Sequence, residues 1–235
     1  MEIRMIWMIL FVLPILFVVL YCAIPYTVRL FSEMDLRRRC RKERVLVLTY
    51  DDGPGEETTP KLLDLLDQHQ AKATFYLVGK NVQIKGSILP RMQRAGHDLA
   101  SHSQNHLNGW KVTPWRSLKD VLQGFSTLKR TNIDFALFRP PYGKINLLTW
   151  LAAARQRIHL GWWTIVSGDT CANLPDVASI VAMAERDGGG VVLMHDFDRS
   201  EERFFYVLDL TARLLDLAES RGWKVMTQRE LLRIR

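Results

Sequence analysis

The chain has 235 residues, 48% of them hydrophobic, and a formal net charge of +7. This length suits one large domain with a substantial core, and the three cysteines, which form no Cys-x-x-Cys pair, argue against a disulfide scaffold. A positive charge is compatible with nucleic acid, an anionic membrane surface or an acidic substrate, and it does not choose among them.

The N-terminal region contains an uncharged apolar run from Met5 to Ile24, with Pro14 as its only helix breaker. A helix needs about 20 apolar residues to cross a bilayer, so this run predicts a single-pass membrane anchor within residues 1–27. A cleaved secretory signal is the alternative. The run is longer than the usual ~7 to 15 residues of such a signal, and no A-x-A cleavage site follows it.

Basic residues gather directly after the apolar run, in residues 28–43, whereas only Arg4 precedes the run. The positive-inside rule therefore predicts that the folded part lies on the cytoplasmic face, with a periplasmic or extracellular location as the alternative. We expect residues 28–43 to form a basic linker. Such a linker either contacts anionic lipid headgroups or is solvated and serves only to set topology.

From residue 44 to residue 235, short apolar runs alternate with amphipathic stretches. Strands are predicted within residues 45–50, 72–79, 97–103, 135–140, 158–166, 189–195 and 223–226. Helices are predicted at residues 58–70, 87–95, 113–129, 146–156, 175–186 and 203–220, with a short C-terminal helix after the last strand. This α/β alternation favours a parallel barrel of about seven strands, with an open doubly wound sheet as the alternative.

Side chains that can act in catalysis or bind a metal follow most of the predicted strands. In a parallel barrel the active site lies where the strands end, so these residues are expected to meet there. The strand ends carry Asp51 and Asp52, "SHSQNH" (101–106), "RPPYG" (139–143), "SGDT" (167–170) and "MHD" (194–196).

The two histidines of "HSQNH" are four residues apart. On a helical turn His102 and His106 would project from the same side and point at one divalent ion, although such a pair also occurs by chance on exposed helices. Adding one carboxylate gives a His, His, Asp trio. That trio is typical of a catalytic zinc site, which keeps a position open for water or substrate.

Asp51 and Asp52 are adjacent at a strand end and therefore point in different directions. One carboxylate can bind the ion while its neighbour faces the bound water as general base. Their mutual repulsion raises the proton affinity of at least one of them unless cations offset it, and Arg139 is the available arginine. Capping of the turn before Gly53 and Pro54 is the alternative, and it explains one aspartate more readily than two.

The motifs "TYDDGP", "HSQNH", "RPPYG" and "VVLMHD" occur here in the order typical of the NodB-homology polysaccharide deacetylases, carbohydrate esterase family 4, which the chain resembles from residue 44 onward. The resemblance implies a distorted (β/α) barrel and metal-dependent hydrolysis of N-acetyl groups on amino sugars. By position it makes Asp51 the general base and Asp52, His102 and His106 the metal ligands. This donor set suits zinc and accepts cobalt, nickel or manganese.

The resemblance also implies roles for the remaining motif residues. Arg139 would orient Asp51, and His195 would be the general acid that protonates the departing amine. Pro141 and Tyr142 would line the substrate groove, with the backbone N–H of Tyr142 helping to stabilise the oxyanion. Leu193 would form an apolar wall for the acetyl methyl group, together with Val191.

One motif departs from the family pattern. Where the family has Asp-x-x-Asp-Trp, this chain has Val166-Ser167-Gly168-Asp169-Thr170, so the first aspartate and the tryptophan are absent. The retained Asp169 is implied to position His195 and to set its pKa. Trp162 or Trp163 replaces the missing tryptophan as a sugar-stacking surface or is a core residue, and we expect only one of them, Trp163, at the groove.

These patterns predict a membrane-tethered, metal-dependent carbohydrate N-deacetylase. The anchor favours a lipid-linked amino sugar as substrate, with chitin oligosaccharide, peptidoglycan glycan and removal of a formyl group as alternatives. A catalytically impaired carbohydrate-binding member is the second hypothesis, because of the altered motif. A nucleic-acid-binding role is disfavoured because the basic residues concentrate beside the anchor, and we expect no obligate protein partner.

Overall fold

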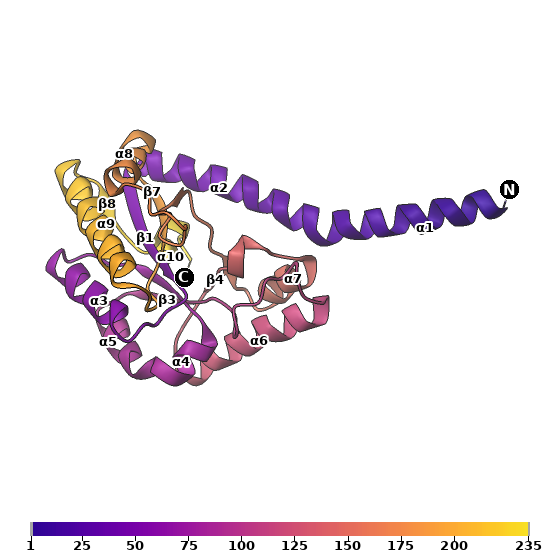
Figure 1. Ribbon diagram of the computed structural model, residues 1–235, viewed down its shortest axis with the longest axis horizontal. Coiled ribbons are helices and arrows are strands. Elements are labelled where there is room, and N and C mark those ends of the chain that lie inside the picture. The colour runs from indigo at the N-terminus through magenta and orange to yellow at the C-terminus, as the bar shows by residue number, and fades with distance from the viewer. Residues whose placement is uncertain (1, 235) are drawn as a thin grey trace.

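The computed structural model describes residues 2–234 and contains one curled sheet whose strand pairs are all parallel (Figure 1). The strand order is β5-β4-β3-β2-β1-β7-β6, and β8 pairs with β1. The strands are β1 (Val45–Asp51), β2 (Thr74–Leu77), β3 (Asp98–Ser101), β4 (Leu137–Phe138), β5 (His159–Leu160), β6 (Ile165–Val166), β7 (Gly190–His195) and β8 (Lys224–Val225). The predicted distorted parallel barrel is confirmed.

The barrel is distorted where one segment joins the two edges of the sheet. We expected a single strand over residues 158–166, but β5 pairs with β4 whereas β6 pairs with β7. Between them, the carbonyls of Gly161 and Trp162 accept hydrogen bonds from the side chains of Arg139 and Gln228 instead of from a strand. The segment changes partner there, which explains why one predicted strand became two.

Helices pack around the sheet, and one of them, α10 (Gln228–Leu232), lies against the barrel interior (Figure 1). They are α3 (Thr58–Gln68), α4 (Gly79–Lys85), α5 (Leu89–Arg94), α6 (Pro114–Arg130), α7 (Leu147–Arg155), α8 (Val177–Asp187), α9 (Glu201–Ser220) and α10 (Gln228–Leu232), with short 3-10 turns η2 (Gly86–Ile88) and η3 (Pro141–Gly143). The prediction missed α4, which begins at Gly79 and has no apolar periodicity to reveal it. The region predicted as one helix over residues 87–95 is divided between η2 and α5.

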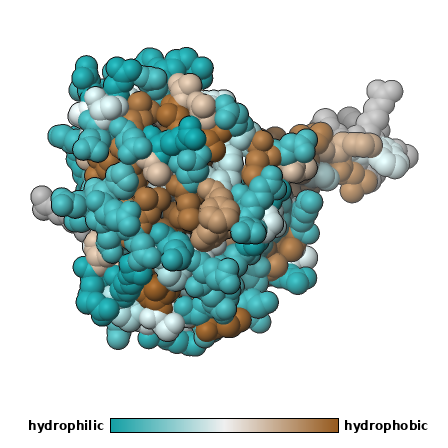
Figure 2. Space-filling model, turned by 60° about the vertical axis from the view of Figure 1, so that its left-hand side comes forward, coloured by the Kyte–Doolittle hydropathy of each residue, from teal (hydrophilic) through white to brown (hydrophobic). Residues whose placement is uncertain are grey.

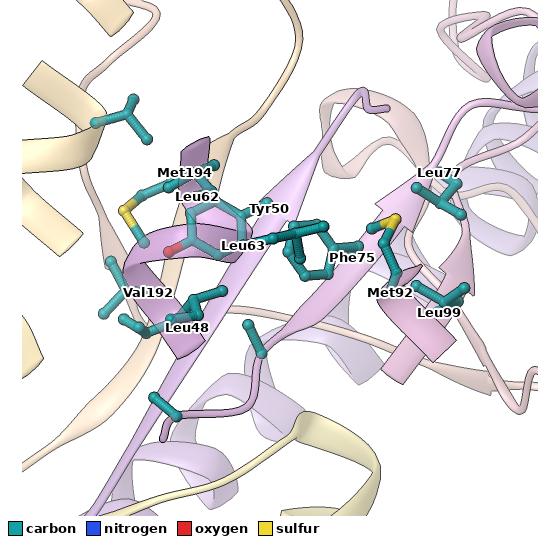
Figure 3. Packing of buried hydrophobic residues seen from close by; sticks show 14 of the residues in the cluster. Leu48, Tyr50, Leu62, Leu63, Phe75, Leu77, Met92, Leu99, Val192 and Met194 are labelled. Atoms are coloured by element: carbon teal, nitrogen blue, oxygen red, sulfur yellow. The ribbon is translucent and has the colours of Figure 1, made fainter. Parts of the chain in front are cut away.

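The main core lies between the sheet and these helices. Side chains alternate across a strand, and Leu48 and Tyr50 of β1 point outward to pack with Leu62 and Phe75 (Figure 3). All four are fully buried. Burying each such apolar side chain contributes about 1.5–3 kcal/mol, so this layer supplies the stability on which the strand ends depend.

The other face of β1 points into the barrel and changes character along the strand. Val45 and Val47 belong to a second apolar cluster with Val191 and Trp162. Thr49 and Asp51 follow on the same face, both buried, where the strand approaches its end. The barrel interior is therefore apolar at its base and polar where the strands end.

A long helix precedes the sheet. It consists of α1 (Glu2–Val18), the π-helical turn η1 (Val19–Ala23) and α2 (Ile24–Glu43); its N-terminal part projects from the domain, and the end of α2 lies along it (Figure 1). The part over Ile9–Glu43 is long and apolar enough to cross a membrane, a property that a signal sequence shares. Figure 2 shows this apolar helix extending beyond a body whose visible face is mostly polar.

Residues 28–43 differ from the expected linker. They are helical, and Leu36 and Cys40 of α2 are buried in the inner apolar cluster. Arg37 donates to the carbonyl of Thr164 (2.5 Å) and pairs with Asp187 (2.9 Å). The prediction missed this packing because the segment is mostly basic and only two apolar residues one helical turn apart, Leu36 and Cys40, reach the inner cluster.

Candidate functional site

Three potential metal ligands converge beside the end of β1. Nε2 of His106 lies 3.1 Å from Oδ1 of Asp52, and Nε2 of His102 lies 3.4 Å from the same oxygen. Asp52 follows directly after β1 with a left-handed backbone (φ 70°). The structure therefore brings together the three residues that the sequence predicted as a ligand set.

The loop that carries the two histidines is not the helical turn that we expected. Residues 102–106 are irregular, with positive φ at Ser103 (66°) and His106 (57°). The buried Asp120 of α6 supports the loop by accepting hydrogen bonds from the backbone (3.0 Å) and side chain (2.8 Å) of Asn105. Tertiary contacts rather than helical spacing bring the imidazoles together.

The donor set fits a divalent cation. Nδ1 of His102 donates to the carbonyl of Arg139 (2.7 Å), and burial lowers the pKa of His102 to about 3, so its Nε2 is an unprotonated acceptor. Oδ1 of Asp52 is buried and has no hydrogen-bond partner among the described residues. Acceptors that face one another without a proton favour a cation between them. The separations of Asp52 Oδ1 from the two Nε2 atoms, 3.1 and 3.4 Å, are close to the distance of about 3.3 Å expected between two ligand atoms of a tetrahedral zinc ion.

Asp51 is held apart from this trio by an arginine. Nη1 of Arg139 donates to Oδ1 of Asp51 (2.7 Å), whereas Oδ2 lies 3.7 Å from Nε2 of His102. Burial raises the pKa of Asp51, and the charge of Arg139 opposes that rise. One oxygen is thus fixed by Arg139 while the other faces the candidate metal ligands.

Arg139 is fully buried, and further groups that the sequence analysis missed hold it in place. Its guanidinium also donates to the hydroxyl of Thr49 (2.8 Å) and to Oε1 of Gln228 (3.1 Å). Gln228 begins the short C-terminal helix α10 and is itself fully buried. No motif marks this glutamine, and only the fold brings it to the arginine.

A second pair of side chains lies on the neighbouring strand β7. In the strand register His195 lies directly opposite Asp51. Nδ1 of His195 is 3.0 Å from Oδ1 of Asp169, as the sequence predicted. Burial alone would lower the pKa of His195, but the hydrogen bond and charge of Asp169 raise it above its ordinary value. For Asp169, His195 and its other partners outweigh burial and lower the pKa.

Arg199 is a further residue at this pair. Its guanidinium donates to Oδ2 of Asp169 (3.1 Å) and to the backbone carbonyl of the same residue (2.9 Å). The hydroxyl of Ser167 donates to Oδ1 of Asp169 (2.8 Å). The carboxylate is therefore held from several sides. Arg199 follows "MHD" by three residues, and its position in the sequence carries no signal of this contact.

The turn after β1 depends on a buried carboxyl group that the sequence analysis did not single out. Asp196 accepts a hydrogen bond from the hydroxyl of Thr59 (2.6 Å), and burial raises the pKa of Asp196 to about 7. A side chain at Gly53 would collide with Asp196, so glycine is required where the two segments meet.

A second carboxylate of the same segment holds the start of α3: Asp198 accepts hydrogen bonds from the backbone N–H groups of Glu56 and Thr58 (2.6 and 3.0 Å).

Comparisons with known proteins decide the family. The sequence model described as polysaccharide deacetylase matches residues 38–160. A peptidoglycan-N-acetylglucosamine deacetylase of Bacillus cereus is 30% identical over 193 residues, which are 81% of this chain and 89% of that protein. The chain belongs to the polysaccharide deacetylase family.

Solved structures of this family share the fold. The Bc1960 peptidoglycan N-acetylglucosamine deacetylase, in complex with 4-naphthalen-1-yl-N-oxidanyl-benzamide, superposes with a TM-score of 0.74 and 26% identity over 81% of this chain and 89% of that one. BA3943, a family pseudoenzyme from Bacillus anthracis, has a TM-score of 0.70 and 22% identity over 82% of this chain and 66% of that one. Because a pseudoenzyme has this fold, the deacetylase fold alone does not establish catalysis.

The residues predicted to bind substrate differ in their exposure. Tyr142 is 58% exposed, and its ring lies 4.6 Å from that of His106. Pro141 is buried, and Leu193 and Val191 are buried on the same strand face as His195. Leu193, two residues before His195, is the nearer of the two to the strand end. The substrate-binding roles of these residues stay predictions.

Trp162 and Trp163, considered as replacements for the missing family tryptophan, have different surroundings. Trp162 is buried in the inner cluster. Trp163 is half-buried, with the guanidinium carbons of Arg29 and Arg139 at 4.7 and 5.4 Å from its ring centre. The expectation that only one of them, Trp163, faces the groove stays a prediction. Arginine contacts already occupy part of the Trp163 ring, and its role in sugar stacking stays a prediction.

Proposed function

We propose that this member of the polysaccharide deacetylase family is a membrane-tethered, metal-dependent enzyme that removes N-acetyl groups from an amino sugar. The observation that carries the proposal is the convergence of Asp52, His102 and His106 beside Asp51, with Nε2 of both histidines within 3.4 Å of an Asp52 oxygen that has no hydrogen-bond partner among the described residues. A structural role does not require such an arrangement. A metal-dependent hydrolase uses such a trio to hold the ion that activates water.

The proposed reaction assigns the first proton transfer to Asp51. Held by Asp52, His102 and His106, a divalent ion would activate a water molecule and polarise the acetyl carbonyl. Arg139 fixes Oδ1 of Asp51, so Oδ2 is the oxygen that takes the proton of the attacking water. The backbone N–H of Tyr142 stabilises the negative charge that develops on the carbonyl oxygen.

His195 completes the reaction. Nδ1 of the imidazole faces Asp169, which leaves Nε2 to donate a proton to the amine nitrogen. The water oxygen forms a bond to the carbonyl carbon while the carbon–nitrogen bond breaks, and acetate and a free amine result. The raised pKa of His195 supports this role because the proton-donating form persists to higher pH.

We further propose a lipid-linked amino sugar as the substrate. The proposal is supported by contacts between the start of α2, which follows the apolar segment directly, and loops near the candidate site. The rings of Tyr26 and Trp110 lie 6.0 Å apart, and Arg29 donates to the carbonyl of Gly143 (3.0 Å). A substrate held at the bilayer surface would meet the groove close to Tyr142.

Acetate release by the full-length protein in lipid nanodiscs tests reaction and substrate together. The panel contains a lipid-linked N-acetylated amino sugar, chitin oligosaccharides and peptidoglycan fragments, with formate measured in parallel. We expect acetate from the lipid-linked sugar at the highest rate, loss of release after chelation, and recovery with zinc. Equal rates on lipid-linked and soluble sugars would contradict the lipid preference. Fastest release from peptidoglycan fragments would favour the substrate that the Bacillus cereus relative's name states.

A carbohydrate-binding protein without catalysis is the second candidate. Val166 and Thr170 replace family residues, and the pseudoenzyme BA3943 shares the fold. This candidate predicts sugar binding by wild type without acetate release. Turnover by wild type that Asp51→Asn abolishes would exclude it.

A further inference from the structure

Arg29 connects α2 to the loop that carries Tyr142. Its side chain is 15% exposed, and Nη1 donates to the backbone carbonyl of Gly143 (3.0 Å). Nε donates to the carboxylate of Glu33 one turn along the helix (2.7 Å). The guanidinium is therefore held in a fixed orientation by its own helix and presented to a turn that is distant in the sequence.

The same guanidinium packs against two indole rings. Its central carbon lies 4.7 Å from the ring centre of Trp163 and 5.1 Å from that of Trp162. Trp163 also lies against Arg139 (5.4 Å), the arginine that fixes Asp51. A continuous series of contacts therefore runs from α2 to the proposed general base.

The turn that Arg29 contacts has an unfavourable backbone. Tyr142 (φ 58°) and Gly143 (φ 64°) are both in the left-handed region, which a non-glycine residue such as tyrosine adopts only when its surroundings hold it there. A side chain at position 143 would collide with Nη1 of Arg29 and with Trp163. The absence of a β-carbon at Gly143 lets the arginine reach the carbonyl.

We propose that Arg29 is a positioning residue for the deacetylation reaction: it holds the turn that places Tyr142 and, through Trp163, supports the arginine that orients Asp51. The inference rests on the proposed function. It makes α2 a part of the active-site framework in addition to its connection to the apolar helix. A chain that lacks α2 would keep the candidate metal ligands and lose this support.

The test compares Arg29→Gln with Arg39→Gln in the full-length protein. Arg39 is a matched control, because it forms an ion pair with Asp35 (2.7 Å) on the same helix but is more exposed, and within residues 2–234 its side chain has no hydrogen bond or ion pair to the site loops. We expect Arg29→Gln to lower kcat at least tenfold while bound metal stays as in wild type, and Arg39→Gln to stay within twofold of wild type. Arg29→Lys, which keeps a donor and a charge, should recover part of the loss.

Two further readouts separate positioning from loss of folding. Guanidinium ion at millimolar concentration should restore part of the activity of Arg29→Ala, because the vacated space is lined by Trp162, Trp163 and the Gly143 carbonyl. Hydrogen exchange of the backbone amides of residues 142–145, which requires no turnover, should be faster in Arg29→Gln than in Arg39→Gln.

The outcomes distinguish this inference from the proposed function. Unchanged exchange in Arg29→Gln, activity equal to that of Arg39→Gln, or loss of bound metal without rescue by guanidinium would overturn the positioning role. No acetate release by wild type, combined with faster exchange in Arg29→Gln, would instead overturn the proposed function and leave the contact between Arg29 and the turn established.

Discussion

Asp51 and Asp52 are neighbours in sequence with different surroundings. Asp51 is buried and paired with Arg139, whereas Oδ1 of Asp52 has no hydrogen-bond partner among residues 2–234 and faces two imidazoles. The sequence analysis assigned the base to Asp51 and the ion to Asp52, and these surroundings suit that assignment. A pair of aspartates that only capped a turn would have no reason to differ in this way.

This difference predicts different outcomes for the two substitutions. Asp52→Ala should lose the bound metal and all activity, because it removes one of three ligands. Asp51→Asn should keep the metal and lower kcat by about 10²–10⁴-fold, the usual contribution of a general base. Metal content by mass spectrometry and acetate release check both, with the exposed Asp209→Asn as a control that should resemble wild type. Normal metal content in both site variants would refute the division of roles.

The pair of His195 and Asp169 predicts a pH dependence. The folded-state pKa of His195 lies above its ordinary value, so the proton-donating form is present below that raised pKa and is lost as the pH rises through it. Activity should therefore decline on the alkaline side of that pKa. Asp169→Asn removes the raising charge and should move the decline to lower pH, with reduced kcat.

The profile of kcat against pH for both proteins checks this prediction. Asp176→Asn, which alters the N-cap of α8, serves as the control and should leave the decline in place. If kcat of Asp169→Asn declines at the same alkaline pH as kcat of wild type, a group other than His195 causes the decline.

At the scale of elements, α2 has packing contacts that the sequence analysis did not predict. Its composition is dominated by arginine, yet Leu36 and Cys40 pack into the inner apolar cluster and Arg37 bonds to the backbone between β5 and β6. The strands were easier to predict because their apolar runs are continuous and their ends carry polar motifs. A helix that buries only a few of its residues gives a weak periodic signal.

The packing of α2 predicts a difference between two leucines of the same helix. Leu36→Ala should lower the free energy of unfolding by about 2–5 kcal/mol, because Leu36 is buried in the inner cluster. Leu30→Ala should change it by less than about 0.5 kcal/mol, because Leu30 is exposed. Chemical unfolding in detergent, followed by tryptophan fluorescence, checks the pair. Equal small effects would show that α2 does not contribute to the domain core.

The positions of site residues could be predicted where a sequence motif contains them. They could not be predicted where only the fold brings a supporting residue to the site. The candidate ligand trio, Asp51, Arg139, and the pair of His195 and Asp169 were all expected from strand-end motifs and lie together in the structure, and their roles stay predictions. Gln228, Asp120 and Arg199 were not expected, because each reaches the site from a segment that has no motif of its own. The geometry of the loop at residues 102–106 was also missed, since its left-handed residues, Ser103 and His106, are not glycines and mark such a backbone only weakly in a sequence.

At the scale of the whole molecule, the distribution of charge predicts orientation. Basic residues after the apolar helix should keep the domain on the cytoplasmic side. A reporter that works only in the cytoplasm should therefore be active when it is fused after Arg235. Replacing Arg38 and Lys42 by glutamine should reduce the preference for the cytoplasmic orientation. Activity of a periplasm-specific reporter instead would place the domain outside and favour a cell-wall glycan as substrate.

The continuity of α2 with the apolar helix determines how far the domain can move from a membrane. A flexible linker of 16 residues would let it wander over about 20–24 Å. The helix instead leads from the apolar segment directly into contacts with Trp162, Trp163 and the inner cluster. If the apolar segment lies in a bilayer, as we propose, this helix would hold the candidate site near a fixed height above the membrane surface. Under the proposed function, such a deacetylase would select its substrate partly by distance, because sugars presented near that height would reach the candidate site most readily.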